Sequence, residues 1–93
     1  MYLIHEVKSF KKSYKRLKLS GVEQKVLNDL KFVINTIARG DKLPESYKDH
    51  DLNGEYLGYR DCHIRGDLIL IYKIEKDRLI LVLLDIGSHS ELF

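Results

Sequence analysis

The stretch RDCHIRGDLILIY, residues 60–72, begins as a polar, punctuated segment and ends as a continuous apolar run. A tight turn at Arg65-Gly66 divides it, which predicts a β-hairpin with strands over residues 56–64 and 67–74. A polar turn at 75–77 then leads to a third apolar segment, residues 78–86. Because the last two strands are apolar on both faces, we expect them at the centre of a sheet, covered by helices.

Two amphipathic helices precede the hairpin. In residues 9–19, apolar side chains recur at helical spacing while basic side chains fill the other faces. Ser20 and Glu23 have the spacing of a capping box that would begin a second helix, and Gly40 offers its C-terminal stop. The short connection predicts an antiparallel helical hairpin. The buried stripe of the second helix is expected to contain Val22, Val26, Leu27, Leu30, Val33, Ile34 and Ile37.

The remaining segments complete the expected topology. Residues 2–7 alternate in a way that favours an opening strand, in which His5 has no chemical role. Residues 41–54 hold the only proline and predict an irregular loop, which at this length is typical of functional loops. The order β-α-α-β-β-β predicts an α+β fold, a mainly antiparallel sheet with the helical hairpin packed on one face. Ninety-three residues allow one domain, residues 1–93.

Composition limits the class of protein. Apolar residues make up 44% and charged residues 32% of the chain, as in ordinary folded proteins. The single cysteine, Cys62, excludes an internal disulfide and a multi-cysteine zinc module, and we expect a buried, inert thiol. No basic-then-apolar leader opens the chain and no apolar run is long enough for a bilayer, so we expect a cytoplasmic protein without a membrane partner.

Charge is distributed unevenly along the chain. Residues 1–48 carry eleven Lys and Arg against five Asp and Glu, whereas residues 49–93 carry five against nine. A basic first half favours a polyanion or an acidic protein as partner. Solvated helix faces would explain the same pattern, so charge alone does not decide the function.

Polar residues with chemical potential fall in three places that a compact sheet could bring to one concave surface. They are Lys48 and His50 in the long loop, Arg60, His63, Arg65 and Asp67 around the hairpin, and Asp85, His89 and Phe93 at the end of the third strand.

Three histidines and a carboxylate fit acid–base catalysis on RNA. One imidazole can accept the proton of the ribose 2′-OH while another protonates the leaving oxygen, and cations stabilise the phosphorane. This chemistry needs no metal or cofactor. A metal site is a weaker alternative, because no close-spaced pair such as H-x-x-x-H is present. Each histidine could also be a separate surface residue with a local hydrogen bond.

Three motifs together, DHDLNGEY, RDCHIRGDLILIY and GSHSELF, resemble the YafQ branch of the RelE/ParE toxin superfamily. The resemblance implies a RelE-like fold and a toxin of a type II toxin–antitoxin pair. It further implies a ribosome-dependent endoribonuclease that cuts translated mRNA, is neutralised by a cognate antitoxin, and contacts DNA only through the antitoxin complex.

The resemblance also assigns residues. His50, His63, Asp67, His89 and Phe93 match functional positions of the family. His89 and His50 would transfer protons, in either order, while His63 and Asp67 would orient them and contact the phosphate. Phe93 would stack on a base, an interaction worth about 1–3 kcal/mol, unless it folds onto the core. We expect Lys48, Arg60 and Arg65 to bind the substrate.

The sequence departs from the family pattern at Asp85, where an arginine is usual, and at Gly66 and Leu68, where proline and tryptophan are common. An anion in place of a cation should slow cleavage. Asp85 therefore keeps open an alternative, a weakly active or inactive toxin-fold protein that binds an antitoxin and acts in operon co-repression. A ParE-like action on a topoisomerase would leave the histidines without a role.

Overall fold

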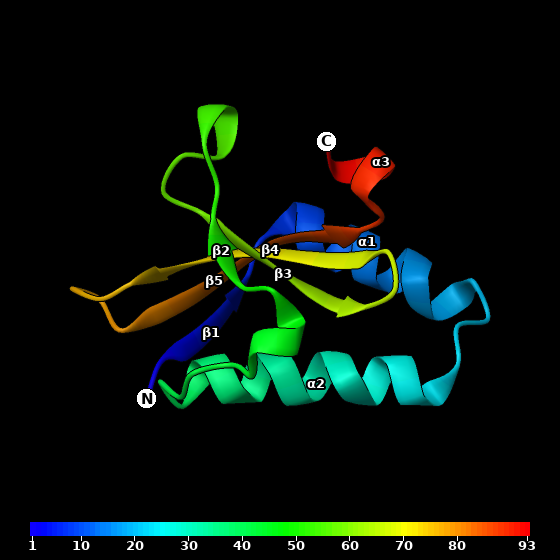
Figure 1. Ribbon diagram of the computed structural model, residues 1–93, viewed down its shortest axis with the longest axis horizontal. Coiled ribbons are helices and arrows are strands. Elements are labelled where there is room, and N and C mark those ends of the chain that lie inside the picture. Colours follow the sequence, from blue (N-terminus) through cyan, green and yellow to red (C-terminus); the bar gives the residue numbers. More distant parts are fainter.

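The computed structural model describes all of residues 1–93 and contains a five-stranded sheet with helices on both faces (Figure 1). The strands lie in the order β1-β5-β4-β3-β2, and only the β1–β5 pair is parallel. Their bounds are β1 Leu3–Glu6, β2 His50–Asp51, β3 Arg60–Arg65, β4 Leu68–Glu75 and β5 Ile80–Gly87. The helices are α1 Lys8–Leu19, α2 Gln24–Ala38 and α3 His89–Leu92, with short 3₁₀ turns η1 Glu45–Tyr47 and η2 Gly54–Tyr56.

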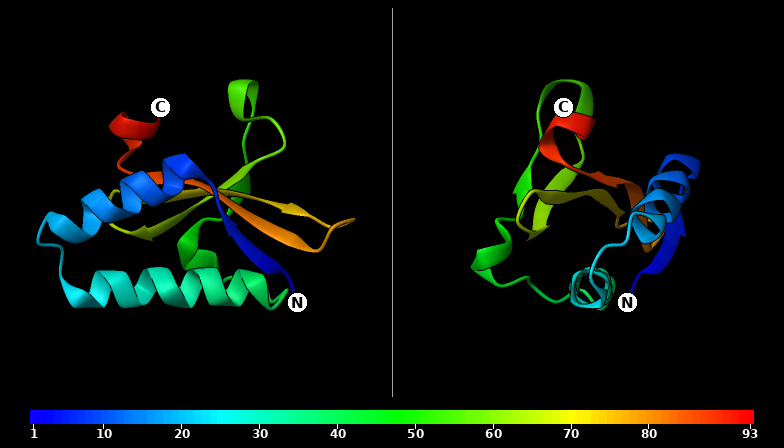
Figure 2. Two further views of the ribbon diagram at one scale, coloured as in Figure 1. Left: turned by 180° about the vertical axis from the view of Figure 1, so that it is seen from behind. Right: turned by 90° about the vertical axis from the view of Figure 1, so that its right-hand side faces the viewer.

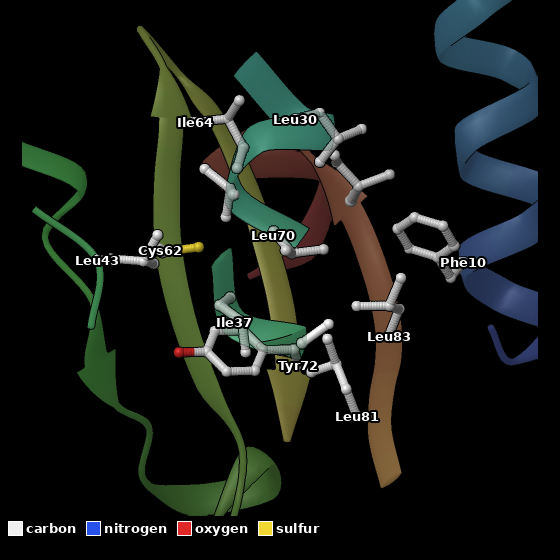
Figure 3. Close-up of a cluster of buried hydrophobic side chains, with 13 residues drawn as sticks. Phe10, Leu30, Ile37, Leu43, Cys62, Ile64, Leu70, Tyr72, Leu81 and Leu83 are labelled. Atoms are coloured by element: carbon white, nitrogen blue, oxygen red, sulfur yellow. The ribbon is translucent and has the colours of Figure 1, made fainter. Parts of the chain in front are cut away.

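The main core lies between the sheet and the pair α1–α2. Helix α1 packs chiefly on β5 and helix α2 on β3, and their chain directions are opposed (Figure 2). Figure 3 shows Phe10 of α1 and Leu30 of α2 meeting side chains of the three central strands. Cys62 is fully buried in this cluster, as expected, and burial raises the pKa of its thiol. None of the helices has both the length and the apolar character needed to cross a membrane.

The opposite face of the sheet carries a second, smaller apolar cluster. Ile69 and Ile71 of β4 pack there against Leu92 of α3. Side chains of the segment between β2 and β3, Leu52, Tyr56 and Tyr59, cover the same cluster. In Figure 1 this segment and α3 rise on one side of the sheet while α2 lies on the other. We call the sheet surface that faces away from α1 and α2 the outer face.

The predicted topology is confirmed, with corrections at the ends of elements. Ser20 does not begin the second helix: its hydroxyl donates to the carbonyl of Leu17 and caps the end of α1, while α2 has no side-chain cap. Gly40 ends α2 as predicted, with φ of +83°. The first hairpin strand begins at Arg60 rather than residue 56, because a 3₁₀ turn and Gly58, with φ of +94°, interrupt the backbone.

Four short elements were not predicted, namely η1, β2, η2 and α3. The loop over residues 41–54 contains η1 and the two-residue strand β2, and residues 89–92 form α3. The tight turn is present but lies at Gly66-Asp67, one residue later than predicted, because Arg65 still pairs with Leu68; Gly66 has a φ of +57°. These short elements matter because β2 carries His50 and α3 carries His89.

Candidate active site

Strand pairing brings two of the three candidate histidines to the outer face. His50 pairs with Asp61 across β2 and β3, and His63 pairs with Ile69 across β3 and β4. Side chains of directly paired residues point to the same face, so these residues share the face of the Ile69 cluster. The ring centroids of His50 and His63 are 6.5 Å apart.

The surroundings of His50 fix which ring nitrogen carries the proton. Its Nδ1 lies 2.7 Å from the carbonyl oxygen of Lys48 and 3.1 Å from Oδ1 of Asp61. Both partners are acceptors when Asp61 is ionised, so Nδ1 is the nitrogen that carries hydrogen. In the neutral ring the lone pair is therefore on Nε2, where it can accept a proton.

Asp61 is the functional candidate that sequence reasoning missed. Its residue is only 4% exposed, and Oδ1 accepts no hydrogen bond because the Nδ1–H of His50 is directed at the carbonyl of Lys48. Burial raises the pKa of Asp61, while the charges of His50, His63 and His89 act to lower it. The sequence alone could have indicated Asp61, because Asp61 and His63 are two apart on one predicted strand and must share a face.

The third histidine and the aromatic residue lie on α3. Ser88 and Glu91 form a capping box at its start, and the backbone N–H of His89 donates to Oδ1 of Asp67 at 3.3 Å. Hydrogen bonding to Ser88 lowers the pKa of Glu91. The ring of Phe93 lies 5.1 Å from that of His89 and is half exposed, so it is not folded into the core.

The segment before β3 holds α3 over the sheet. The hydroxyl of Tyr56 donates to the carbonyl of Leu92 at 3.1 Å, and its ring meets Phe93 edge-on at 5.5 Å. Asp67, at the β3–β4 turn, secures the start of α3, and Tyr56 secures its end. All three candidate histidines therefore belong to elements that meet on or beside the outer face.

Two predicted substrate-binding residues are not brought to this surface. Arg60 pairs with Tyr72, which lies in the main core, and it lines a cavity of about 240 Å³ near the end of α2. A β-bulge after His63 turns Arg65 the same way, and its Nε donates to Asp29 of α2 at 2.7 Å. Both arginines were expected to bind the substrate, but their guanidinium groups are engaged on the helix side, so neither supplies a cation to the outer face. Lys48 remains exposed beside His50.

Asp85 does lie on the outer face. It pairs with Ile71, which in turn pairs with Asp61, so the two carboxylates flank one apolar residue. Oδ1 of Asp85 accepts from the backbone N–H of Ile86 at 2.8 Å. No three His, Cys, Asp or Glu side chains are close enough together to hold a metal ion.

The fold and the outer-face histidines together define a RelE-like bacterial toxin of a type II toxin–antitoxin system. The family model described as "Bacterial toxin of type II toxin-antitoxin system, YafQ" matches residues 2–93, and the chain belongs to that family.

Individual relatives agree with this assignment. The mRNA interferase toxin YafQ of Escherichia coli K12 is 41% identical over 80 residues, 85% of each chain. The putative toxin YafQ of Haemophilus influenzae is 54% identical over 54 residues, which span only 53% of that protein. Among solved structures, the E. coli DinJ-YafQ complex matches with a TM-score of 0.85 and 33% identity, covering 100% of this chain and 99% of that one.

Proposed function

We propose that this chain is an endoribonuclease that cuts mRNA on the ribosome by metal-free acid–base catalysis in the cytoplasm, and that a cognate antitoxin inhibits it. The observation that carries the proposal is the grouping of His50, Asp61 and His63 on the outer face, with His89 joined to that face through Asp67. The relatives named as mRNA interferases and the DinJ-YafQ complex support the activity and the antitoxin partner.

The geometry favours His50 as the base. Neutral His50 offers the Nε2 lone pair, which takes the proton of the 2′-OH. The oxygen then attacks the adjacent phosphorus, and the bond to the 5′-oxygen breaks. Asp61, whose Oδ1 lies 3.1 Å from Nδ1, stabilises the imidazolium that forms through the negative charge of its carboxylate.

His89 is then the acid that protonates the leaving 5′-oxygen. It is exposed at the first turn of α3, so its protonated ring can reach a substrate lying on the outer face. Asp67 acts on it indirectly, because its carboxylate accepts from the backbone of His89. His63 lies beside His50 and orients it, and Lys48 contributes positive charge near the phosphate.

Phe93 provides the surface against which a base can stack. Half of the residue is exposed, while one side of the ring is supported by Tyr56 and His89. A supported ring is already ordered before RNA arrives, so little entropy is lost when a base stacks on it.

The test compares His89→Ala with His5→Ala, which removes an exposed imidazole from β1. Each purified protein is added to ribosomes translating a defined mRNA, and the new 5′ ends are mapped by primer extension. We expect wild type and His5→Ala to cut equally, and His89→Ala to be slower by roughly 10²–10⁴-fold. Equal cleavage by all three would remove His89 from the mechanism, and intact mRNA with wild type would remove the nuclease proposal.

A second function, antitoxin binding without catalysis, is favoured by one observation. Asp85 places an anion on the outer face, and neither Arg60 nor Arg65 compensates for it there. If wild type leaves mRNA intact yet co-purifies with the protein encoded beside it and represses their shared promoter, this alternative replaces the first.

A further inference from the structure

His50 lies on the shortest strand of the sheet. Strand β2 contains two residues, and only two register pairs, His50 with Asp61 and Asp51 with Arg60, join it to β3. Two residues before the strand, Lys48 has a left-handed backbone with φ of +50°. The side chain of His50 is about half exposed. So short a strand has few ladder hydrogen bonds, and backbone pairing alone does little to fix the orientation of the imidazole.

A single arginine joins the residues on either side of His50. Nε and Nη2 of Arg60 donate to the two carboxylate oxygens of Asp49 at 3.2 and 3.1 Å. Its Nη1 donates to Oδ1 of Asp51. The hydroxyl of Tyr72 also donates to Asp49, which anchors this aspartate to the main core. Figure 3 shows the Tyr72 oxygen directed out of the core toward the β2 side.

The alternation of side chains makes this arrangement specific for His50. Neighbouring residues on a strand point to opposite faces, so His50 projects toward Asp61 on the outer face while its flanking aspartates turn toward Arg60. Holding the side chains before and after a residue fixes the direction of the side chain between them.

We propose that Arg60 is a positioning residue whose guanidinium clamps Asp49 and Asp51 and thereby sets the orientation of the His50 imidazole. The proposal rests on the proposed function only in giving His50 a proton to transfer. The single positive charge of the clamp also offsets part of the negative charge of the two carboxylates, which would otherwise repel the phosphates of an approaching RNA more strongly.

The chemistry of the clamp requires arginine. Two parallel N–H···O bonds to one carboxylate, with a third to another, use the planar fork of a guanidinium, whereas an ammonium is a single point of charge. The hydrogen bond to Asp49 raises the pKa of Arg60 further above its ordinary value, so the clamp stays charged at every working pH. Lysine at this position would retain the charge and lose the geometry.

The experiment uses Arg60→Lys and, as a matched control, Arg78→Gln, which breaks the exposed Arg78–Glu75 pair in the β4–β5 turn. Long-range ¹H–¹⁵N spectra of the folded proteins report the tautomer of His50. We expect one Nδ1–H tautomer in wild type and control, and a mixture of tautomers in Arg60→Lys. On ribosomes, kcat of Arg60→Lys should fall roughly tenfold to hundredfold with KM unchanged, the reduction expected from a displaced catalytic group.

Asp51→Asn removes one arm of the clamp and keeps the experiment decisive if Arg60→Lys does not fold. Its side chain is 82% exposed, so we expect the main core to form without it. If the folded variants keep a single Nδ1–H tautomer at His50, as in the wild type, the proposal that Arg60 orients this imidazole is wrong. The spectra can be recorded on an inactive protein. If the wild type leaves mRNA intact, the nuclease proposal fails, but the tautomer of His50 still shows whether Arg60 orients the imidazole.

Discussion

At the scale of single residues, the outer face is defined by the alternation of side chains along β3. Arg60, Cys62 and Ile64 turn toward α2, while Asp61 and His63 turn away from it. The sequence predicts that Asp61 and His63 lie on the same face, because residues two apart on a strand share a face. The direction of the Arg65 side chain could not be predicted. The β-bulge after His63 turns Arg65 toward the helices, and no sequence pattern indicates this bulge.

Asp85→Arg should increase the rate of cleavage. Asp85 lies on the outer face in register with Ile71 and Asp61, where a cation would stabilise the charge that develops on the phosphorane. We expect single-turnover cleavage on ribosomes to rise by roughly tenfold to hundredfold. Asp77→Arg in the exposed β4–β5 turn makes the same change of net charge and should leave the rate unaltered; if both variants speed cleavage alike, net charge rather than position is responsible.

Asp61→Asn should stabilise the fold while impairing cleavage. The pKa of Asp61 is raised by burial, so the folded state holds its proton more tightly than the unfolded chain, and stability falls as pH rises through the raised pKa. The amide of asparagine carries no charge, so the variant avoids the cost of ionising a buried carboxyl group.

The pH dependence of unfolding stability distinguishes the loss of the buried charge at Asp61 from a change in stability that is independent of pH. In urea unfolding, the gain should be greatest at pH values well above the raised pKa of Asp61, where the wild type holds a charged carboxylate, and absent below the ordinary carboxyl pKa of about 4. The charges that act on Asp61 are those of His50, His63, His89 and Asp49. Asp77→Asn serves as the exposed control. A variant that is destabilised at every pH would mean that Asp61 is a structural residue.

At the scale of elements, length decides what the sequence can predict. The central strands and both long helices are specified by apolar periodicity that extends over many residues. Strand β2 and helix α3 have two and four residues, too few for a period to be visible. They form because long-range partners hold them: Arg60 and Asp61 for β2, Asp67 and Tyr56 for α3.

Ser88→Ala should loosen α3 and reduce cleavage without unfolding the protein. The Ser88 hydroxyl accepts from the backbone of Glu91, and an N-cap of this kind is worth about 1 kcal/mol. Hydrogen exchange should quicken at the α3 amides only, and the cleavage rate should fall several-fold because His89 is less well placed. Ser46→Ala, at an exposed serine of η1, is the control. Unchanged exchange in Ser88→Ala would show that Tyr56 and Asp67 suffice.

At the scale of the whole molecule, basic charge and the proposed catalytic histidines lie on different sides. The solvent-facing basic residues of α1 are on the helix side of the sheet, whereas the histidines are on the outer face. This separation suits a protein that grips structured RNA with one surface and cuts mRNA with another. The uneven charge was visible in the sequence, but its position opposite the histidines required the fold.

Replacing Lys11 and Lys15 of α1 by glutamine should weaken binding to ribosomes and make it less sensitive to salt. For every phosphate that a lysine no longer neutralises, the slope of log affinity against log salt should become shallower by about 0.9. Sedimentation with ribosomes over a range of KCl concentrations measures this. Lys76→Gln with Arg78→Gln removes the same charge from the β4–β5 turn and should change neither. Equal weakening by both pairs would indicate a response to net charge alone.

The parallel pairing of β1 with β5 has a consequence for biosynthesis. Leu3 pairs with Ile80, so the first strand has no partner until the fifth has been made. Contacts between such distant positions form late in folding and cannot form on an incomplete chain. The nascent polypeptide therefore cannot complete its sheet until β5 has left the ribosome. Under the proposed function, this delay would keep the nuclease inactive during its own synthesis and would give a newly made antitoxin time to bind it.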